Sequence, residues 1–209
     1  PRYAGYTAWR GVAPFDQARL TPGETFGRGV RFGMAPIANG RAYWYATQNT
    51  SEGGRDQPGG RKRALLELFR GAHAPIEDVI AATDETAILR NDIYDREPLE
   101  HWSDGRVTLL GDAAHPMTPN LGQGACQALE DAVVLADALQ QIGDVGAALR
   151  QYEARRIGRT SMLVRQARQV GAVGQWQNPL ACRLRDALMK YVVAHVQDRQ
   201  LKRVAGYVV

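Results

Sequence analysis

Residues 106–141, GRVTLLGDAAHPMTPNLGQGACQALEDAVVLADALQ, constrain the fold of this chain more than any other segment. An apolar run from Val107 to Leu110 ends in Gly111-Asp112, and a loop that contains proline and glycine follows it. A long helix rich in Ala, Leu and Val then begins near Gly122. This pattern predicts a strand, a ligand-binding loop and the N-terminus of a helix.

The start of this helix is suited to a flat or anionic ligand. The first turn of a helix has backbone N–H groups without intrahelical partners and a partial positive charge. Three small residues, Gly122, Gly124 and Ala125, would let a ligand approach that backbone. Asp112, at the end of the strand, can accept hydrogen bonds from the hydroxyl groups of a sugar-like ligand. An ordinary junction of strand, loop and helix without a ligand is the alternative.

The segment resembles the second FAD-binding motif of the single-component flavoprotein aromatic hydroxylases, the para-hydroxybenzoate hydroxylase-like monooxygenases. The resemblance implies that Asp112 of the Gly111-Asp112 pair binds the ribityl chain and that Pro119 lies beside the flavin ring. It also implies a turn that directs backbone N–H groups at the N1/C2 carbonyl edge of the isoalloxazine, formed by Gly122, Gln123, Gly124 and Ala125. Such a helix N-terminus would stabilise the negative charge that reduced flavin carries at this edge.

Other parts of the family pattern are missing from the sequence. Flavoproteins of this kind begin with a strand, a G-x-G-x-x-G turn and a helix that together hold the ADP half of FAD. No G-x-G-x-x-G occurs here, and Tyr3 to Val12 resembles the strand that enters the substrate domain in the middle of a family member. We therefore expect the chain to be the C-terminal portion of a longer enzyme, and to hold FAD weakly by itself.

The expected fold class is α+β, an α/β flavoprotein fragment with a β-sheet substrate domain, the C-terminal part of a Rossmann-like FAD-binding domain, and C-terminal helices. Its expected domains are 1–97, which is β-rich and binds substrate, 98–142, the end of the FAD-binding domain, and 143–209, the helices. Shorter elements support this division. We expect helices at Arg61 to Arg70 and at Pro75 to Ala82, and a returning strand at Ala87 to Tyr94.

Two aromatic-rich strands, VRFGMAPI and RAYWYATQ, are joined by Ala38-Asn39-Gly40, and Asn-Gly predicts a hairpin with a two-residue turn. Such a turn would pair Ala38 with Arg41. On these strands Arg31 and Tyr43 are the candidate catalytic residues, and we expect both to face one cavity, offset diagonally. Their spacing resembles the bacterial FAD-dependent urate hydroxylases, in which an Arg and a Tyr at matching positions contact the purine. The alternative is that Arg31 is a surface residue and Tyr43 a core residue.

The resemblance implies an FAD-dependent monooxygenase, with NAD(P)H as co-substrate and O2 activated as a flavin C4a-hydroperoxide. Its substrate would be a small aromatic, purine or alkene molecule, because urate hydroxylases and zeaxanthin epoxidases are the subgroups that it resembles most. Three alternatives stay open: a non-catalytic remnant, a subunit whose partner supplies the missing FAD half, and a flavin reductase or halogenase on the same scaffold. A homodimer is compatible with each of these.

Composition excludes several other classes. No apolar segment reaches the roughly 18 residues that span a bilayer, and no signal peptide is recognisable, so we expect a cytoplasmic protein. Cys126 and Cys182 are in no metal-ligand spacing, and no metal site is predicted. Residues 150–209 contain 12 Lys/Arg against 3 Asp/Glu, but these are spread over helices, which argues against nucleic-acid binding.

We expect His115 to make a hydrogen bond that stabilises its loop.

The end of the chain predicts one more amphipathic helix. Between Arg183 and Arg203 apolar residues recur at helical spacing: Leu184, Leu188, Tyr191 or Val192, and His195 or Val196. We expect this stripe to pack on the cofactor domain or on a second subunit. Binding to a membrane surface is the less favoured alternative.

Overall fold

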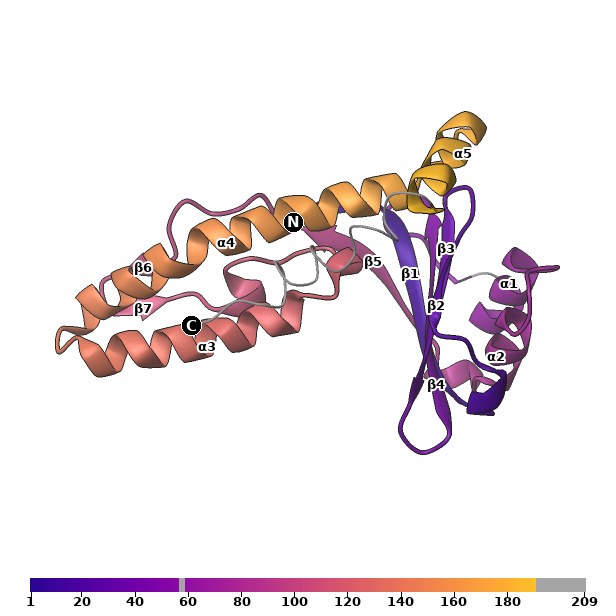
Figure 1. Cartoon of the computed structure of the whole chain (residues 1–209), viewed down its shortest axis with the longest axis horizontal. Coiled ribbons are helices and arrows are strands. Elements are labelled where there is room, and N and C mark those ends of the chain that lie inside the picture. Colours follow the sequence, from indigo (N-terminus) through magenta and orange to yellow (C-terminus); the bar gives the residue numbers. More distant parts are fainter. Residues whose placement is uncertain (57–58, 191–209) are drawn as a thin grey trace. The chain divides into compact units, whose positions relative to one another are not determined.

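The computed structural model describes residues 1–56 and 59–190, which divide into two compact units. Among the described residues, one unit contains Gly5–Ile93 and Gly174–Cys182, and the other contains Pro1–Ala4, Tyr94–Val173 and residues 183–190. Figure 1 shows an antiparallel sheet with short helices in the first unit and two long helices in the second. The predicted α+β class is confirmed, whereas the three domain boundaries stay a prediction. In the part of the chain that the structure describes, no helix is long and apolar enough to cross a membrane.

The sheet has five strands in the order β2-β3-β4-β1-β5. Their bounds are β1 Arg2–Pro14, β2 Gly23–Phe26, β3 Val30–Ile37, β4 Arg41–Asn49 and β5 Leu89–Asp95. Two helices, α1 (Gly60–Leu68) and α2 (Ile76–Ala82), pack against one face of the sheet, close to their predicted positions. Single 3-10 turns at Gln17–Arg19 and Glu85–Ala87 complete the connections.

Aromatic side chains fill the core between this face and the two helices. The Phe32 ring stacks on Trp44 with 5.6 Å between centroids, and it meets Phe69 edge-on at 5.2 Å. Trp44 is fully buried, and its Nε1–H donates to Thr83 Oγ1 at 2.8 Å, so its one polar atom keeps a partner in the core. Trp44 therefore links the sheet to the end of α2.

The β3–β4 hairpin exists, but its predicted register is wrong by one residue. Ile37 pairs with Arg41, so the loop has three residues, Ala38-Asn39-Gly40, of which Asn39 and Gly40 have φ of 64° and 63°. The extra loop residue shifts the pairing of β3 with β4 by one residue, so that Arg31 pairs with Thr47. Because side chains alternate between faces, this observed register puts Arg31 and Tyr43 on the same face, opposite α1 and α2.

The second unit contains a short β-ribbon and an antiparallel pair of helices. The ribbon pairs β6 (Ser103–Asp104) with β7 (Val107–Thr108), and 3-10 turns follow at Gly111–Ala113 (η3) and Pro119–Leu121 (η4). Helices α3 (Gly124–Gln141) and α4 (Val145–Gly174) then run side by side. Their apolar core includes Trp102, Val134 and Tyr152.

One of three sequence predictions about these elements is wrong, one holds to within two residues, and one lies partly outside the described residues. The strand expected at Val107 to Leu110 is only two residues long, because the backbone turns into η3 at Gly111. The helix expected near Gly122 begins at Gly124, since Gly122 takes a left-handed conformation with φ 63°. Helix α5 spans Pro179–Leu188, where Leu184 and Leu188 are about half exposed, and the rest of the predicted C-terminal stripe lies outside the described residues.

Candidate functional site

The loop between β7 and α3 forms a pocket of about 550 Å³. All seven residues predicted to hold the cofactor line it: Gly111, Asp112, Pro119, Gly122, Gln123, Gly124 and Ala125. Its remaining lining residues are Leu110, Met117, Thr118 and Ala128. The structure therefore brings the predicted set together on one surface, although their individual roles stay predictions.

Two glycines with positive φ shape the loop before α3. Gly111 has φ 59°, and a Cβ on it would lie 3.2 Å from the Cβ of Ala128. Gly122 also has a positive φ, and it ends η4 immediately before the helix begins. Since residues with a side chain rarely adopt this conformation, glycine is favoured at both positions. The backbone, not side chains, shapes this wall of the pocket.

The N-terminus of α3 opens onto the pocket without an internal cap. Gln123 is the N-cap residue, it makes no side-chain capping hydrogen bond, and no acidic residue occurs in the first turn. A Cβ on Gly124 would meet Asp112 Oδ1 at 3.9 Å and no other atom within that range, so Gly124 leaves room beside the exposed Asp112 carboxylate. The N–H groups of the first turn, the Asp112 carboxylate and the space at Gly124 together fit a ligand that carries both hydroxyl groups and an electron-rich edge.

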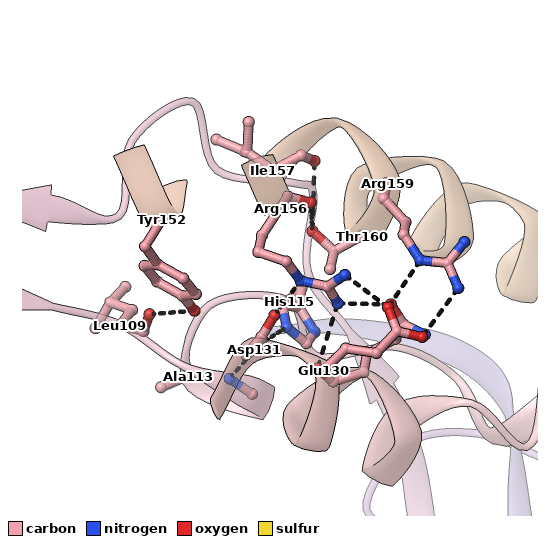
Figure 2. A network of polar contacts seen from close by, with 12 residues as sticks. Leu109, Ala113, His115, Glu130, Asp131, Tyr152, Arg156, Ile157, Arg159 and Thr160 are labelled. Atoms are coloured by element: carbon pink, nitrogen blue, oxygen red, sulfur yellow. Dashed lines mark hydrogen bonds and ion pairs between the residues drawn. The ribbon is translucent and has the colours of Figure 1, made fainter. Parts of the chain in front are cut away.

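Asp131 on α3 is a buried carboxylate that binds the pocket loop (Figure 2). Its Oδ2 accepts the Gly111 backbone N–H at 3.0 Å and the His115 Nε2 hydrogen at 2.6 Å. Its Oδ1 accepts from Arg156 Nε on α4 at 2.7 Å. The loop-stabilising hydrogen bond predicted for His115 is thus confirmed, and Asp131 joins the loop, α3 and α4.

Arg156 extends this arrangement into a buried ionic network (Figure 2). Besides Asp131, it contacts Glu130 Oε2 at 2.6 Å and the Gln127 side-chain carbonyl at 2.8 Å. Arg159 binds both carboxylate oxygens of Glu130, with Nε donating to Oε2 at 2.8 Å and Nη2 donating to Oε1 at 3.0 Å. Because each buried charge has a partner of opposite sign, the network avoids the large cost of an isolated buried ion.

Hydrogen bonding sets the ionisation of Asp131. Burial disfavours its charged form, but hydrogen bonds from His115, Arg156 and the Gly111 N–H outweigh burial and hold the pKa of Asp131 below its usual value. Nearby, burial and the charge of Asp131 raise the pKa of Tyr152, whose hydroxyl donates to the Leu109 carbonyl at 3.1 Å. Asp131 is therefore a fixed negative charge, and Tyr152 is a neutral donor.

The predicted substrate residues lie in the sheet unit. Arg31 is 4% exposed, its Nε donates to Glu24 Oε1 at 2.6 Å, and its guanidinium lies 5.2 Å from the Phe26 ring centre. Tyr43 is half-buried and pairs with Ala35, four residues along β3 from Arg31. Tyr45 lies between them, with its ring over Gly33. Burial and the Glu24 carboxylate raise the pKa of Tyr45, and this tyrosine, unlike Tyr43, is the one beside Arg31.

Sequence reasoning missed Asp131, Arg156 and Glu24 because their partners come from other elements. One indication of the Asp131 network was present in the sequence. Gln127 and Asp131 interrupt the apolar side of α3 at helical spacing, and a polar residue on a buried helix face needs a partner. No comparable pattern indicated Glu24, because its partner Arg31 is on a different strand. In the part of the chain that the structure describes, no cluster of His, Cys, Asp and Glu could hold a metal ion.

Comparison with known proteins gives a consistent result. Residues 11–167 match the model of a family described as FAD binding domain. Aurachin C monooxygenase/isomerase of Stigmatella aurantiaca is 47% identical over 205 residues, which cover 97% of this chain and 53% of that protein. The chloroplastic zeaxanthin epoxidase of Nicotiana plumbaginifolia is 44% identical over 170 residues, which cover 74% of this chain and 25% of the epoxidase.

Solved structures agree with these sequence matches. HpxO of Klebsiella pneumoniae, in complex with FAD and uric acid, superimposes on 98% of this chain with a TM-score of 0.89 and 33% identity, and the match covers 54% of HpxO. A salicylate hydroxylase substrate complex shares the fold, with a TM-score of 0.72 and 24% identity. The chain thus spans about half the length of aurachin C monooxygenase/isomerase and of HpxO.

Proposed function

Because this chain belongs to the FAD binding domain family, we propose that it provides part of an FAD-dependent monooxygenase. The reaction would use NAD(P)H and O2 to hydroxylate or epoxidise a small aromatic, purine or alkene substrate. Its similarity to aurachin C monooxygenase/isomerase, zeaxanthin epoxidase and HpxO supports oxygen transfer over other uses of a flavin.

The observation that carries this proposal is the pocket at the N-terminus of α3. Asp112 and the uncapped first turn of the helix line the same pocket. An exposed carboxylate can accept hydrogen bonds from ribityl hydroxyls, while backbone N–H groups and the helix dipole stabilise an electron-rich ring edge. The pocket beside α1 differs, because Glu85 already accepts hydrogen bonds from the Arg61 and Lys62 backbone N–H groups at that helix N-terminus.

FAD, when bound, would supply the hydride and oxygen chemistry, which no protein side chain provides. The residues of this chain would bind and orient it. Asp112 would hold the ribityl chain, Pro119 would lie beside the ring, and the turn from Gly122 to Ala125 would direct N–H groups at the ring edge. The glycines leave the space that a flat ring requires, since a side chain at Gly124 would project beside Asp112.

For the substrate, we propose the sheet face that carries Arg31 and Tyr43. Arg31, Tyr43 and Tyr45 share this face, opposite α1 and α2. Since Glu24 already neutralises Arg31, the guanidinium would act mainly through its fixed N–H groups and not as a free positive charge. The half-buried tyrosine rings offer flat apolar area and hydroxyl groups to an aromatic or alkene substrate.

The test measures FAD affinity of the full-length protein before and after Asp112→Ala. We expect binding to weaken by about 1.5–3 kcal/mol, the range for losing hydrogen bonds to a charged group, or roughly 10- to 150-fold in Kd. Asp104→Ala is the matched control, because Asp104 is an exposed aspartate in the β6–β7 ribbon and lies outside the pocket. Equal FAD retention in wild type and Asp112→Ala would remove Asp112 from the site, and a wild type that binds no FAD would overturn the proposal.

A further inference from the structure

We infer that Asp131 is a positioning residue for the cofactor loop, acting through Gly111 and His115 to fix the orientation of Asp112. This inference rests on the proposed FAD site. Asp131 itself does not line the pocket, and it is fully buried. Its effect on a bound cofactor would therefore be indirect, through the loop that it binds.

The two loop contacts of Asp131 lie on either side of Asp112 in the sequence. Gly111 immediately precedes Asp112, and His115 follows it by three residues, so the Asp131 carboxylate binds the loop on both sides of Asp112, through the Gly111 backbone N–H and the His115 side chain. Both contacts converge on the same oxygen, Oδ2. The Ala114 and His115 N–H groups also bond to the Gly111 carbonyl, which closes the turn around Asp112.

The His115 ring uses one of its two nitrogens to bind Asp131. Its Nε2 is 2.6 Å from a carboxylate oxygen, whereas its Nδ1 is buried and has no hydrogen-bond partner among the described residues. This arrangement places the ring proton on Nε2, where it is donated to Asp131. The histidine thus makes one side-chain hydrogen bond in the described chain, and that bond serves the loop.

The contacts of Glu130 distinguish this role from helix packing. Glu130, the neighbour of Asp131 on α3, also binds Arg156, and in addition it binds Arg159. In the described chain, the side-chain hydrogen bonds of Glu130 go to Gln127, Arg156 and Arg159, none of which lies in the pocket loop. Glu130 and Asp131 therefore share the task of pairing α3 with α4, but only Asp131 also holds the loop.

The experiment compares four variants of the full-length protein: Asp131→Asn, Glu130→Gln, His115→Leu and His115→Gln. Three quantities are measured: Kd for FAD, the visible circular dichroism of bound flavin, and the Tm of the FAD-free protein. Asp131→Asn would turn an amide NH2 toward at least one of the three donors that Asp131 binds, which are the Gly111 N–H, His115 Nε2 and Arg156 Nε. We therefore expect both FAD affinity and Tm to fall. Glu130→Gln should lower Tm and leave FAD affinity and the flavin spectrum as in wild type.

The histidine pair decides the question if Asp131→Asn fails to fold. His115→Leu removes the bond to Asp131 together with the contact between the His115 ring and Trp102, and we expect about a tenfold loss of FAD affinity with an altered flavin spectrum. Gln at position 115 can still donate to the carboxylate, and it should restore much of that affinity. The inference is overturned if His115→Leu binds FAD like wild type, or if Glu130→Gln weakens FAD as much as Asp131→Asn does. A wild type that binds no FAD would instead refute the proposed function.

Discussion

At the scale of single residues, the cofactor pocket depends on the absence of side chains. Gly111→Ala should destabilise the FAD-free protein by about 1–3 kcal/mol, because it adds a left-handed non-glycine residue and a methyl group 3.2 Å from Ala128. Gly122→Ala is the control, since its φ is similar but no atom lies within 4 Å of the new Cβ. Unfolding in guanidinium chloride measures both. If Gly122→Ala loses as much stability as Gly111→Ala, the contact with Ala128 has no part in the effect.

The residues that the sequence revealed are those whose function follows from local chemistry. Asp112, Gly122 and Gly124 lie within a few residues of a recognisable loop and helix start, and the structure places them together. Asp131 and Glu24 were not identified. Asp131 contacts Arg156, which is 25 residues away on another helix, and such a contact depends on how the helices pack. Helix periodicity shows that Asp131 is buried, but it does not identify its partner.

At the scale of elements, one carboxylate joins two strands to a helix. Asp95, the last residue of β5, is bound by Arg2 of β1 at 2.8 and 2.9 Å and by Arg168 of α4 at 2.7 Å. Burial disfavours its charge, but the hydrogen bonds from Arg2 and Arg168 outweigh burial and lower the pKa of Asp95. Asp95 therefore holds these three elements together with a negative charge that persists at pH values below the usual pKa of a carboxylate.

The lowered pKa gives a pH prediction with a definite sign. Stabilisation by Asp95 is fully present above the unfolded-state pKa of about 4, and it is lost as pH falls through the lower folded-state pKa. The free energy of unfolding should therefore decrease from pH 5 to pH 3, and Asp95→Asn should decrease less over this range and be less stable at pH 7. Denaturant unfolding at several pH values measures this, with the exposed Asp104→Asn as control. A wild type and Asp95→Asn of equal pH dependence would contradict it.

The β3–β4 hairpin shows where element-scale prediction stops. Alternation and Asn-Gly gave both strands and the position of the turn, but the register depends on whether two or three residues form the loop. A shift of one residue moves every side chain to the other face. With the two-residue turn, Arg31 would pair with position 48 and lie on the face opposite Tyr43, whereas the three-residue loop brings both to one face.

At the scale of the whole molecule, an apolar stripe on α3 has no cover in the described chain. Leu129, Val133 and Leu139 are 69%, 53% and 43% exposed, and Ala125, Ala132 and Ala136 lie among them on the exposed side of the helix. Val107 of β7 is 69% exposed as well. Monomeric proteins rarely leave a continuous apolar surface in water, so a stripe of this kind usually marks a contact with another part of a protein.

We therefore expect residues 1–209, produced alone, to self-associate through this stripe and to bind FAD weakly. Sedimentation velocity over a concentration series measures the association, and flavin fluorescence measures the binding. Replacing Leu129 and Val133 by Lys should shift the chain toward monomer, because two charges in an apolar contact are costly to desolvate. Leu180→Lys is the control, since Leu180 is 72% exposed but lies on α5. A monodisperse wild-type monomer that binds FAD at nanomolar affinity would show that the stripe needs no partner and that these residues already form a complete cofactor site.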